Sequence, residues 1–245
     1  MSRLSSLRVK IFADGASLQE MTTWARRPQI RGFTTNPTLM RQAGVTDYEA
    51  FARDALRALP DRPISFEVFS DDFDDMERQA RRIASWGENV YVKIPITNTA
   101  AQPSTALVDR LSHSGIKVNV TAVLSLRQVQ EAAAALSGGA PSAVSVFAGR
   151  IADTGRDPVP LMRQAVAIVK AVPAIEVIWA SPREVLNVYQ ADEIGCHVVT
   201  VTSGILGKLG LAGKDLEEFS LDTVRMFRTD AIEAGYELSG DEQPA

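Results

Sequence analysis

Cysteine and histidine are scarce in this chain of 245 residues. Its single cysteine, Cys196, excludes an internal disulfide and any multi-cysteine zinc cage, and its apolar neighbours indicate a small buried side chain. The two histidines, His113 and His197, cannot supply an HExxH motif or a three-histidine cage. The sequence therefore predicts no metal centre.

Long hydrophobic runs are also missing. No stretch of about 18 apolar residues is present that could span a membrane, and the first ten residues lack the apolar segment of a secretory signal. We therefore expect a soluble, cytoplasmic protein. The net charge of −4, with acidic and basic residues interspersed, argues against a nucleic-acid-binding surface and leaves any phosphate binding to individual arginines. We expect a small substrate, with no nucleic acid and no membrane as partner.

What the sequence does contain is a regular alternation of β-rich runs and helix-like segments. The eight β-rich runs are Val9–Ala13, Ile30–Thr34, Ile64–Val68, Val90–Ile94, Lys117–Thr121, Ala143–Phe147, Glu176–Trp179 and Val198–Val201. Apolar residues at three- and four-residue intervals predict helices at Tyr48–Leu59, Asp72–Ser85, Leu126–Leu136, Val159–Ala171 and Arg183–Ala191. Strands that alternate with helices predict a parallel sheet.

Eight such units in a chain of this length favour a closed (β/α)8 barrel over an open, doubly wound sheet. Neither GxGxxG nor GxxxxGK(S/T) follows the first β-rich run, which argues against a dinucleotide-binding or P-loop fold. We predict an α/β protein made of a single (β/α)8 barrel, or TIM barrel, with an extra C-terminal helix.

The extra helix is predicted from the amphipathic stretch beyond the eighth unit. We expect one barrel domain over residues 1–245 that carries a helical extension at 214–235. The apolar side chains of the extension are available to pack against the barrel or a neighbouring subunit. We expect a homo-oligomer. The final residues, 239–245, are typical of a flexible polar tail.

Lys93 is the most informative single residue, because it lies in a β-branched and aromatic run that otherwise predicts a buried strand. Burial disfavours the ammonium form, so a buried lysine can be neutral near pH 7 and can attack a carbonyl to form a Schiff base. In the alternative, the alkyl stem reaches a strand end or the amine pairs with a carboxylate, which is the commoner fate of a lone strand lysine. The run by itself leaves both open.

Polar side chains collect at the carboxyl ends of the predicted strands, where barrel enzymes carry their chemistry. They are Asp14, Thr34, Thr35, Asn36, Glu67, Lys93, Asn119, Thr121, Ser145, Arg150, Ser181, Arg183, Thr202 and Ser203. Most have a local alternative: Asp14-Gly15 is a turn dipeptide, and Asn36-Pro37 fits a helix N-cap followed by proline. Together, two carboxylates, two amides and several hydroxyls around one lysine resemble an assembled acid/base site.

The segment Ser181-Pro182-Arg183 predicts a serine N-cap and a proline that open a helix after the seventh strand. Helix N-termini offer free N–H groups and a positive dipole end, and phosphates bind at this place in barrels. Arg183 and Arg150 could add bidentate contacts to a dianion, although a surface salt bridge is the default for either arginine alone. A phosphorylated substrate fits these residues best.

These motifs resemble the transaldolase family, including its short members and the related fructose-6-phosphate aldolases. The resemblance runs nearly end to end and rests on six segments: Phe12-Ala13-Asp14, Gly32-Phe33-Thr34-Thr35-Asn36-Pro37-Thr38, Val92-Lys93-Ile94-Pro95, Asn119-Val120-Thr121, Ser145-Val146-Phe147-Ala148-Gly149-Arg150-Ile151 and Ala180-Ser181-Pro182-Arg183. The Thr-Thr-Asn-Pro element followed by the Lys-Ile-Pro strand is specific, whereas either alone would be weak.

The resemblance implies a Schiff-base enzyme that needs neither a cofactor nor a metal. Lys93 would attack the ketose carbonyl, and Asp14 would take the proton of the C4 hydroxyl during C3–C4 cleavage. Glu67 and Thr121 would hold the water that relays protons during Schiff-base formation and hydrolysis. Asn36 and Asn119 would hydrogen-bond the bound dihydroxyacetone unit. Thr34 and Ser145 would line the pocket. Arg150, Ser181 and Arg183 would bind the sugar phosphate.

Two positions bear on the type of reaction. The direct aldolases of the family tend to have glutamine and tyrosine where this chain has Glu67 and Phe147, the pair found in transaldolases. We therefore expect a transaldolase that moves a dihydroxyacetone unit from a ketose phosphate such as fructose 6-phosphate to an aldose phosphate such as erythrose 4-phosphate. The close alternative is a reversible aldolase that uses free dihydroxyacetone or a related ketone. The distant alternative is a non-catalytic phosphosugar-binding barrel. Gly15, Val146 and Pro182 depart from the usual residues of the family, which leaves the identity of the sugars open.

Overall fold

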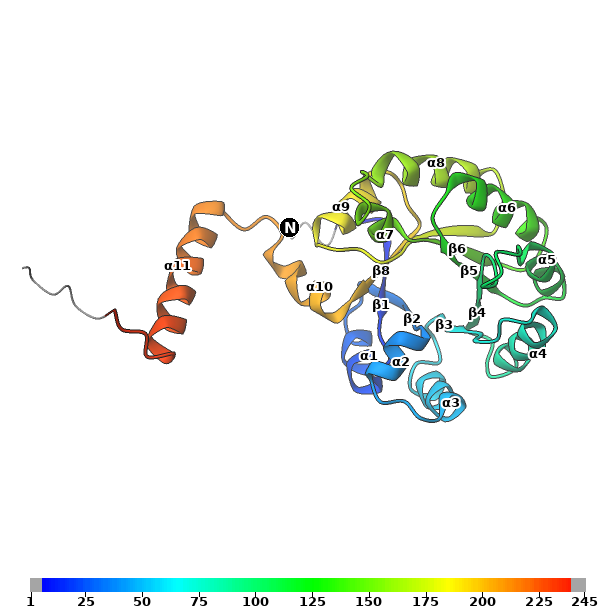
Figure 1. Cartoon of the computed structure of the whole chain (residues 1–245), viewed down its shortest axis with the longest axis horizontal. Coiled ribbons are helices and arrows are strands. Elements are labelled where there is room, and N and C mark those ends of the chain that lie inside the picture. Colours follow the sequence, from blue (N-terminus) through cyan, green and yellow to red (C-terminus); the bar gives the residue numbers. More distant parts are fainter. Residues whose placement is uncertain (1–5, 239–245) are drawn as a thin grey trace, which may run out of the picture. The chain divides into compact units, whose positions relative to one another are not determined.

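Eight parallel strands close into a barrel in the computed structural model, which describes residues 6–238 (Figure 1). The strands are β1 (Lys10–Asp14), β2 (Ile30–Thr34), β3 (Ile64–Glu67), β4 (Val90–Pro95), β5 (Val118–Val123), β6 (Ser142–Val146), β7 (Ile175–Trp179) and β8 (Val198–Thr202). Neighbours in sequence pair in parallel, and β8 pairs with β1. The predicted (β/α)8 barrel is confirmed, and no strand end differs from its predicted position by more than two residues. The predicted tail, 239–245, lies outside the described residues.

Helices follow the strands and form a ring around the barrel (Figure 1). They are α1 (Leu18–Ala25), α2 (Pro37–Gln42), α3 (Tyr48–Ala58), α4 (Phe73–Ala84), α5 (Thr105–His113), α6 (Leu126–Leu136), α7 (Ala148–Ala152), α8 (Val159–Lys170), α9 (Leu186–Glu193) and α10 (Ser203–Lys208). Helices α3, α4, α6 and α8 agree with the predicted ranges to within one residue.

The predicted start of the helix after β7 is wrong. Helix α9 begins at Leu186, with Val185 at its N-cap, rather than at Arg183. Ser181 has a φ of 60°, in the left-handed region, whereas a capping serine takes an extended backbone. Residues 181–185 therefore form a loop at the barrel mouth, and Ser181 caps no helix.

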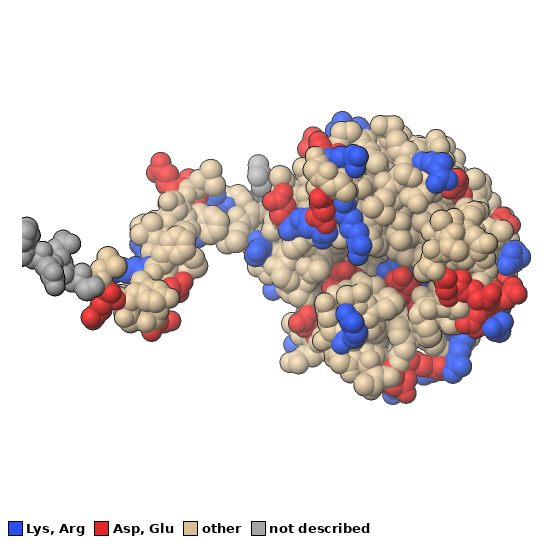
Figure 2. Space-filling model, viewed as in Figure 1, with Lys and Arg blue, Asp and Glu red and all other residues tan. Residues whose placement is uncertain are grey.

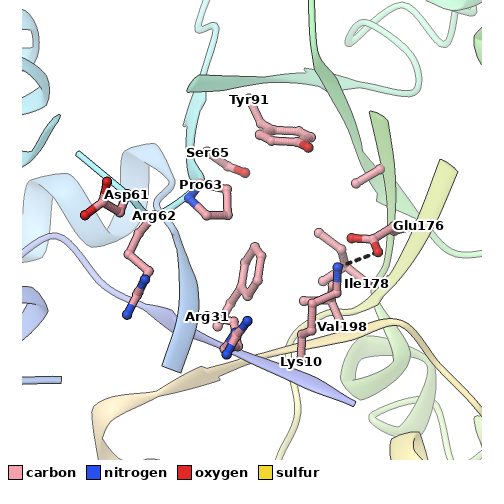
Figure 3. Close-up of a pocket in the computed structure, with 12 residues that line it drawn as sticks. Lys10, Arg31, Asp61, Arg62, Pro63, Ser65, Tyr91, Glu176, Ile178 and Val198 are labelled. Atoms are coloured by element: carbon pink, nitrogen blue, oxygen red, sulfur yellow. Dashed lines mark hydrogen bonds and ion pairs between the residues drawn. The ribbon is translucent and has the colours of Figure 1, made fainter. Parts of the chain in front are cut away.

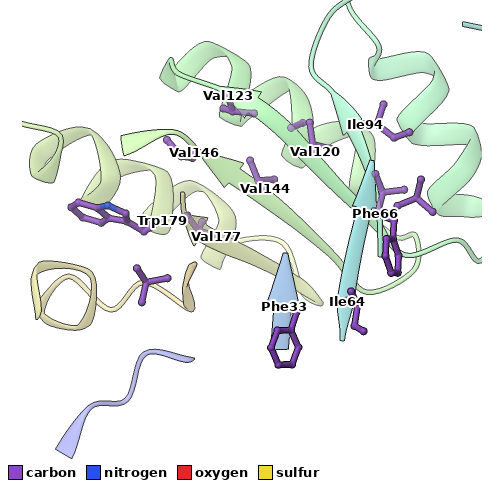
Figure 4. Close-up of a cluster of buried hydrophobic side chains, with 14 of the residues drawn as sticks. Phe33, Ile64, Phe66, Ile94, Val120, Val123, Val144, Val146, Val177 and Trp179 are labelled. Carbon is purple, nitrogen blue, oxygen red and sulfur yellow. The ribbon is translucent and has the colours of Figure 1, made fainter. Parts of the chain in front are cut away.

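An apolar layer fills the space between the strands and the helices (Figure 4). Its fully buried members include Phe33, Ile64, Phe66, Ile94, Val120, Val144, Val177 and Trp179. Successive side chains of a strand point to opposite faces, so the positions between these apolar residues face the barrel interior. Toward the carboxyl ends of the strands those interior positions are polar. We therefore expect a functional site at that end of the barrel.

A small apolar cluster lies in the barrel interior below the polar level. Phe12, Ala143, Ile178 and Val198 form a small buried cluster of their own, separate from the layer under the helices. Gly32 makes room for this cluster, because a Cβ atom at Gly32 would lie 2.6 Å from Cζ of the Phe12 ring. The pairing of Phe12 with Gly32 across β1 and β2 thus fixes the ring inside the barrel.

The amino-terminal ends of the strands surround a hollow, at the end of the barrel opposite to these polar positions (Figure 3). Lys10, Arg31, Tyr91 and Glu176 are among its lining residues, and Lys10 Nζ lies 2.5 Å from Glu176 Oε1. Both side chains of this ion pair are partly exposed, at 42% and 37%. Exposed pairs of this kind contribute little to stability, typically about 0–1 kcal/mol.

The chain divides into two compact units, Met1–Leu209 and Gly210–Ala245. The second unit contains helix α11 (Leu216–Glu233), which begins after Asp215, whose carboxylate accepts from the N–H groups of Glu217 and Glu218. Its exposed apolar side chains are Leu216, Phe219, Leu221, Val224, Met226, Phe227 and Ile232. The packing of this helix on another surface stays a prediction.

In the part of the chain between residues 6 and 238, no helix is long and apolar enough to cross a membrane.

We predict that Gly32→Ala destabilises the barrel, because the added methyl group would overlap the Phe12 ring. Overpacking of this kind typically costs about 1–3 kcal/mol. Thermal and denaturant unfolding would measure the change. Gly204→Ala is the matched control, since nothing lies within 4 Å of a Cβ at that position, and its midpoint should not fall. Equal melting of Gly32→Ala and the wild type would contradict the assigned role of Gly32.

Candidate active site

A pocket opens at the carboxyl ends of the strands, inside the first unit. Its lining includes Asp14, Thr34, Asn36, Glu67, Lys93, Thr121, Ser145, Phe147, Arg150, Ser181, Arg183 and Thr200. Every residue to which the sequence assigns a role in the site lines this pocket except Asn119. Figure 2 shows basic and acidic side chains together around the hollow at the middle of the ring of helices.

Lys93 is buried in the floor of the pocket, with a relative exposure of 5%. Its Nζ lies 2.9 Å from Glu67 Oε2 and donates a hydrogen bond to the backbone carbonyl of Thr35 at 2.8 Å. Glu67 and Lys93 are register partners on β3 and β4, so the sheet itself brings amine and carboxylate together. The carboxylate is therefore within reach to exchange a proton with the amine.

Asp14 ends β1 and is the second carboxyl group of the pocket. Thr34 Oγ1 donates to Asp14 Oδ1 at 2.7 Å and also lies 2.5 Å from Thr200 Oγ1. Burial raises the pKa of Asp14, while the positive charge of Lys93 and the hydrogen bond from Thr34 act in the opposite direction. A carboxyl group whose pKa is raised can both hold and release a proton nearer to neutral pH, as a general acid or base must.

Asn36 and Thr121 each have capacity left for a bound molecule. The side-chain oxygen of Asn36 accepts from the N–H of Leu39 and so caps α2, with Pro37 at the first helical position, as predicted. This leaves the amide NH2 of Asn36 to donate into the pocket. Thr121 Oγ1 is buried without a hydrogen-bond partner within residues 6–238. A buried hydroxyl normally has a partner, so a substrate hydroxyl or a water fits this position.

Asn119 lies behind the pocket rather than on its surface. It is fully buried, accepts a hydrogen bond from Ser145 Oγ at 2.7 Å and donates one to Ser65 Oγ at 3.1 Å. Of this chain of three residues, Ser145 and not Asn119 lines the pocket. In this structure Asn119 orients Ser145, and the direct contact to substrate that the sequence predicts for it stays a prediction.

One edge of the pocket carries two guanidinium groups. Arg150 lies on α7 with its guanidinium carbon 5.5 Å from the centre of the Phe147 ring, and Arg183 donates to Ser181 Oγ at 3.0 Å. Arg183 also forms a two-point ion pair with Asp153, which raises the pKa of the guanidinium and lowers that of the carboxyl group. Asp153 thus orients Arg183 at the mouth, where an anionic group could approach both arginines.

Gly149 allows this edge to close. A Cβ atom at Gly149 would lie 1.6 Å from the carbonyl oxygen of Ser181, so only glycine lets α7 approach the loop after β7. The same approach brings Arg150, the next residue, to the side of the pocket that holds Arg183.

Sequence reasoning missed Thr200 and Asp153. Thr200 could have been found, because it shares the strand parity of Thr202 on β8 and alternates with apolar Val199 and Val201. Asp153 had no such signal, since its partner Arg183 is 30 residues away in sequence. Of the other strand-end residues, Ser203 lies outside the lining and accepts a hydrogen bond from Trp24 Nε1 at 3.0 Å.

The fold and the pocket together define a class of protein: a (β/α)8 barrel enzyme with a buried, carboxylate-paired lysine at its mouth. A sequence model of the Transaldolase/Fructose-6-phosphate aldolase family matches residues 11–239, and the chain belongs to this family. The predicted resemblance is confirmed.

Relatives at moderate identity cover most of the chain. A protein of Dehalococcoides mccartyi described as a probable transaldolase is 35% identical over 199 residues, which are 81% of this chain and 88% of the relative. A probable transaldolase of Methanococcus maripaludis strain C7 is 34% identical over 218 residues, or 87% and 97% of the two chains. These matches span nearly the whole length of both relatives.

Solved structures at low identity share the fold. A protein of the HpcH/HpaI aldolase/citrate lyase family from Burkholderia cenocepacia has a TM-score of 0.58 at 15% identity, covering 91% of this chain and 97% of that one. Thiamine phosphate pyrophosphorylase from Pyrococcus furiosus has a TM-score of 0.55 at 14% identity, covering 82% and 88%. At such identities the likeness concerns the barrel alone.

We predict that Thr34→Val raises the pKa of Asp14 further. The hydrogen bond from Thr34 favours the ionised carboxylate, so its loss adds to the upward shift that burial already produces. Titration of the Asp14 carboxyl carbon by NMR would measure the change, and the acid limb of any activity that needs ionised Asp14 would move to higher pH with it. Thr200→Val leaves the Thr34–Asp14 hydrogen bond in place and should shift the titration less. An unchanged midpoint in Thr34→Val would refute the assignment.

Proposed function

We propose that this chain is a transaldolase that carries a dihydroxyacetone unit on Lys93. The observation that carries the proposal is the buried amine of Lys93, 2.9 Å from Glu67, in a pocket that also holds Asp14. Membership in the transaldolase/fructose-6-phosphate aldolase family supports it, as do the relatives described as probable transaldolases. Glu67 and Phe147, the pair of residues that resembles the transaldolase branch, both line the pocket.

In the proposed reaction the neutral amine of Lys93 adds to the ketose carbonyl, and loss of water gives a protonated imine. Glu67 accepts and returns the protons of these steps, because its carboxylate is the group paired with the amine. Thr121, whose buried hydroxyl has no protein partner within residues 6–238, is suited to hold the water that is lost and later regained. The imine then acts as an electron sink at C2 of the sugar.

Cleavage needs a base near the C4 hydroxyl, and Asp14 is proposed for it. Asp14 takes the hydroxyl proton, the C3–C4 bond breaks, its electron pair passes into the imine, and an aldehyde leaves. The remaining enamine on Lys93 adds to the carbonyl carbon of an acceptor aldehyde while Asp14 returns the proton. Hydrolysis then releases the new ketose and restores the free amine.

The two arginines at the pocket edge are proposed to bind the phosphate of donor and acceptor. Arg150, on the helix after β6, and Arg183, in the loop after β7, lie at the same edge of the pocket. Ser181 adds a hydroxyl group there. Guanidinium groups match the geometry of a phosphate dianion, which supports sugar phosphates as the substrates. Asn36 and Ser145 are proposed to hydrogen-bond the hydroxyl groups of the dihydroxyacetone unit. A cytoplasmic location and a homo-oligomer remain predictions.

We predict that borohydride traps fructose 6-phosphate on Lys93, and that erythrose 4-phosphate discharges the adduct before reduction. Reduction of an imine leaves a stable secondary amine, so peptide mass spectrometry would locate the added mass. Lys93→Ala should abolish trapping, whereas Asp14→Ala should keep trapping and lose C–C cleavage.

Three results would redirect the proposal. Release of an aldehyde from fructose 6-phosphate without any acceptor would favour the reversible aldolase. Tight binding of the sugar phosphate with no adduct from any ketose of a panel would favour a non-catalytic phosphosugar-binding barrel. Full turnover in Asp14→Ala would overturn the role of Asp14.

We predict that Arg183→Ala raises KM for phosphorylated substrates by about tenfold or more, because a hydrogen bond to a charged group is worth about 1.5–3 kcal/mol. Steady-state kinetics with phosphorylated and unphosphorylated sugars would show whether the loss depends on the phosphate. Arg156→Ala is the matched control, since Arg156 lies outside the pocket lining and its guanidinium donates to Thr154. A similar KM in both variants would argue against phosphate binding by Arg183.

A further inference from the structure

The hydrogen-bond ladder between β2 and β3 ends at the level of the Lys93–Glu67 pair. Along this ladder the N–H of Phe33 donates to the carbonyl of Pro63, and two residues later the N–H of Thr35 donates to the carbonyl of Ser65. Thr34 and Ser65 are register partners. Continued by two residues, the same register would pair Glu67 with the backbone of residues 35 and 37.

Neither of those two partners serves Glu67. Residue 37 is Pro37, which has no N–H to donate to the Glu67 carbonyl and already belongs to helix α2. The carbonyl of Thr35, which would accept from the Glu67 N–H, instead accepts the hydrogen bond from Lys93 Nζ at 2.8 Å. Both backbone groups of Glu67 on the β2 side are thus left without their ladder partners.

The hydroxyl of Tyr48 takes the place of both. It donates to the carbonyl of Glu67 at 2.8 Å and accepts from the N–H of Glu67 at 2.8 Å. A hydroxyl group can do this because it is one donor and an acceptor at once. Leaving a buried backbone group unpaired costs free energy, so this single side chain completes the end of β3.

Tyr48 is itself held from several sides. It is the first residue of α3, next to Asp47, whose carboxylate accepts from the N–H of Ala50. Its ring packs edge-on against Phe66 and Phe69, with centroids 6.4 and 5.5 Å away, and lies 6.0 Å from the ring of Trp86. Burial raises the pKa of the Tyr48 hydroxyl, so the group keeps its proton and remains a donor.

We propose that Tyr48 is a positioning residue for the Lys93–Glu67 pair. By pairing both backbone groups of Glu67, the Tyr48 hydroxyl fixes the carboxylate opposite Lys93 and leaves the Thr35 carbonyl free to hold the amine. Tyr48 does not line the pocket, so it acts through Glu67 and not on the substrate. The effect on turnover rests on the proposed function, whereas the effect on the amine does not.

The test is Tyr48→Phe, which keeps the ring and removes the hydroxyl. With ketose phosphate and acceptor, we expect kcat to fall by about tenfold or more with KM little changed, because displacement of catalytic groups by about 1 Å can cost as much as 10²-fold. Independently of any substrate, we expect Lys93 to be acetylated several-fold faster by trace acetic anhydride at one fixed pH, because its contacts to Glu67 and Thr35 loosen. Peptide mass spectrometry would give the rate at Lys93.

Tyr91→Phe is the matched control, since Tyr91 lies on β4 at the opposite end of the barrel and lines the hollow there. It should leave both kcat and the acetylation of Lys93 unchanged. A lower melting temperature of Tyr48→Phe with wild-type acetylation of Lys93 would mean a merely structural role and overturn the proposal. A rise in KM at constant kcat would assign Tyr48 to substrate binding and overturn it as well. If the wild type turns over no ketose phosphate, the proposed function fails, and the acetylation rates alone decide the role of Tyr48.

Discussion

The burial of one primary amine constrains the rest of the site. Lys93 is held between the carboxylate of Glu67 and the carbonyl of Thr35, above a small apolar cluster around Phe12. Removing one partner of a buried ion pair typically costs about 3–5 kcal/mol, so a lysine in this place requires partners that do not move. The register of β3 with β4 supplies Glu67, and the early end of the β2–β3 ladder supplies the carbonyl of Thr35.

The barrel divides its side chains by level and by face. Apolar residues on the outer face of each strand pack under the helices, and a small cluster around Phe12 lies inside the barrel between its two ends. At the carboxyl ends of the strands the interior positions are polar, so the groups that would handle protons, Asp14 and Glu67, share one pocket with Lys93. The arginines stand at the rim, where a phosphate would stay partly hydrated while the sugar carbonyl reaches the buried amine.

Much of the site could be predicted because it follows from strand parity and from short motifs. Every strand was recognisable from its β-branched run, and the polar residue at each strand end was then placed at the mouth by the rule for barrels. The predicted N-cap at Ser181 was wrong, because the pattern of serine followed by proline fits a cap, whereas tertiary contacts put Ser181 in a left-handed turn against Gly149. The place of Asn119 behind Ser145 could not be read from the sequence, since parity gives the face of a residue and not its depth.

The sequence by itself determined the class of fold, the family and the residues of the pocket, because periodicity and motif order are properties of neighbouring residues in the chain. Only the tertiary structure decided how those residues are held. The pairing of Tyr48 with Glu67, of Asp153 with Arg183 and of Thr200 with Thr34 joins segments 19 to 166 residues apart. Such contacts depend on how helices and loops pack around the closed barrel, which no local pattern records.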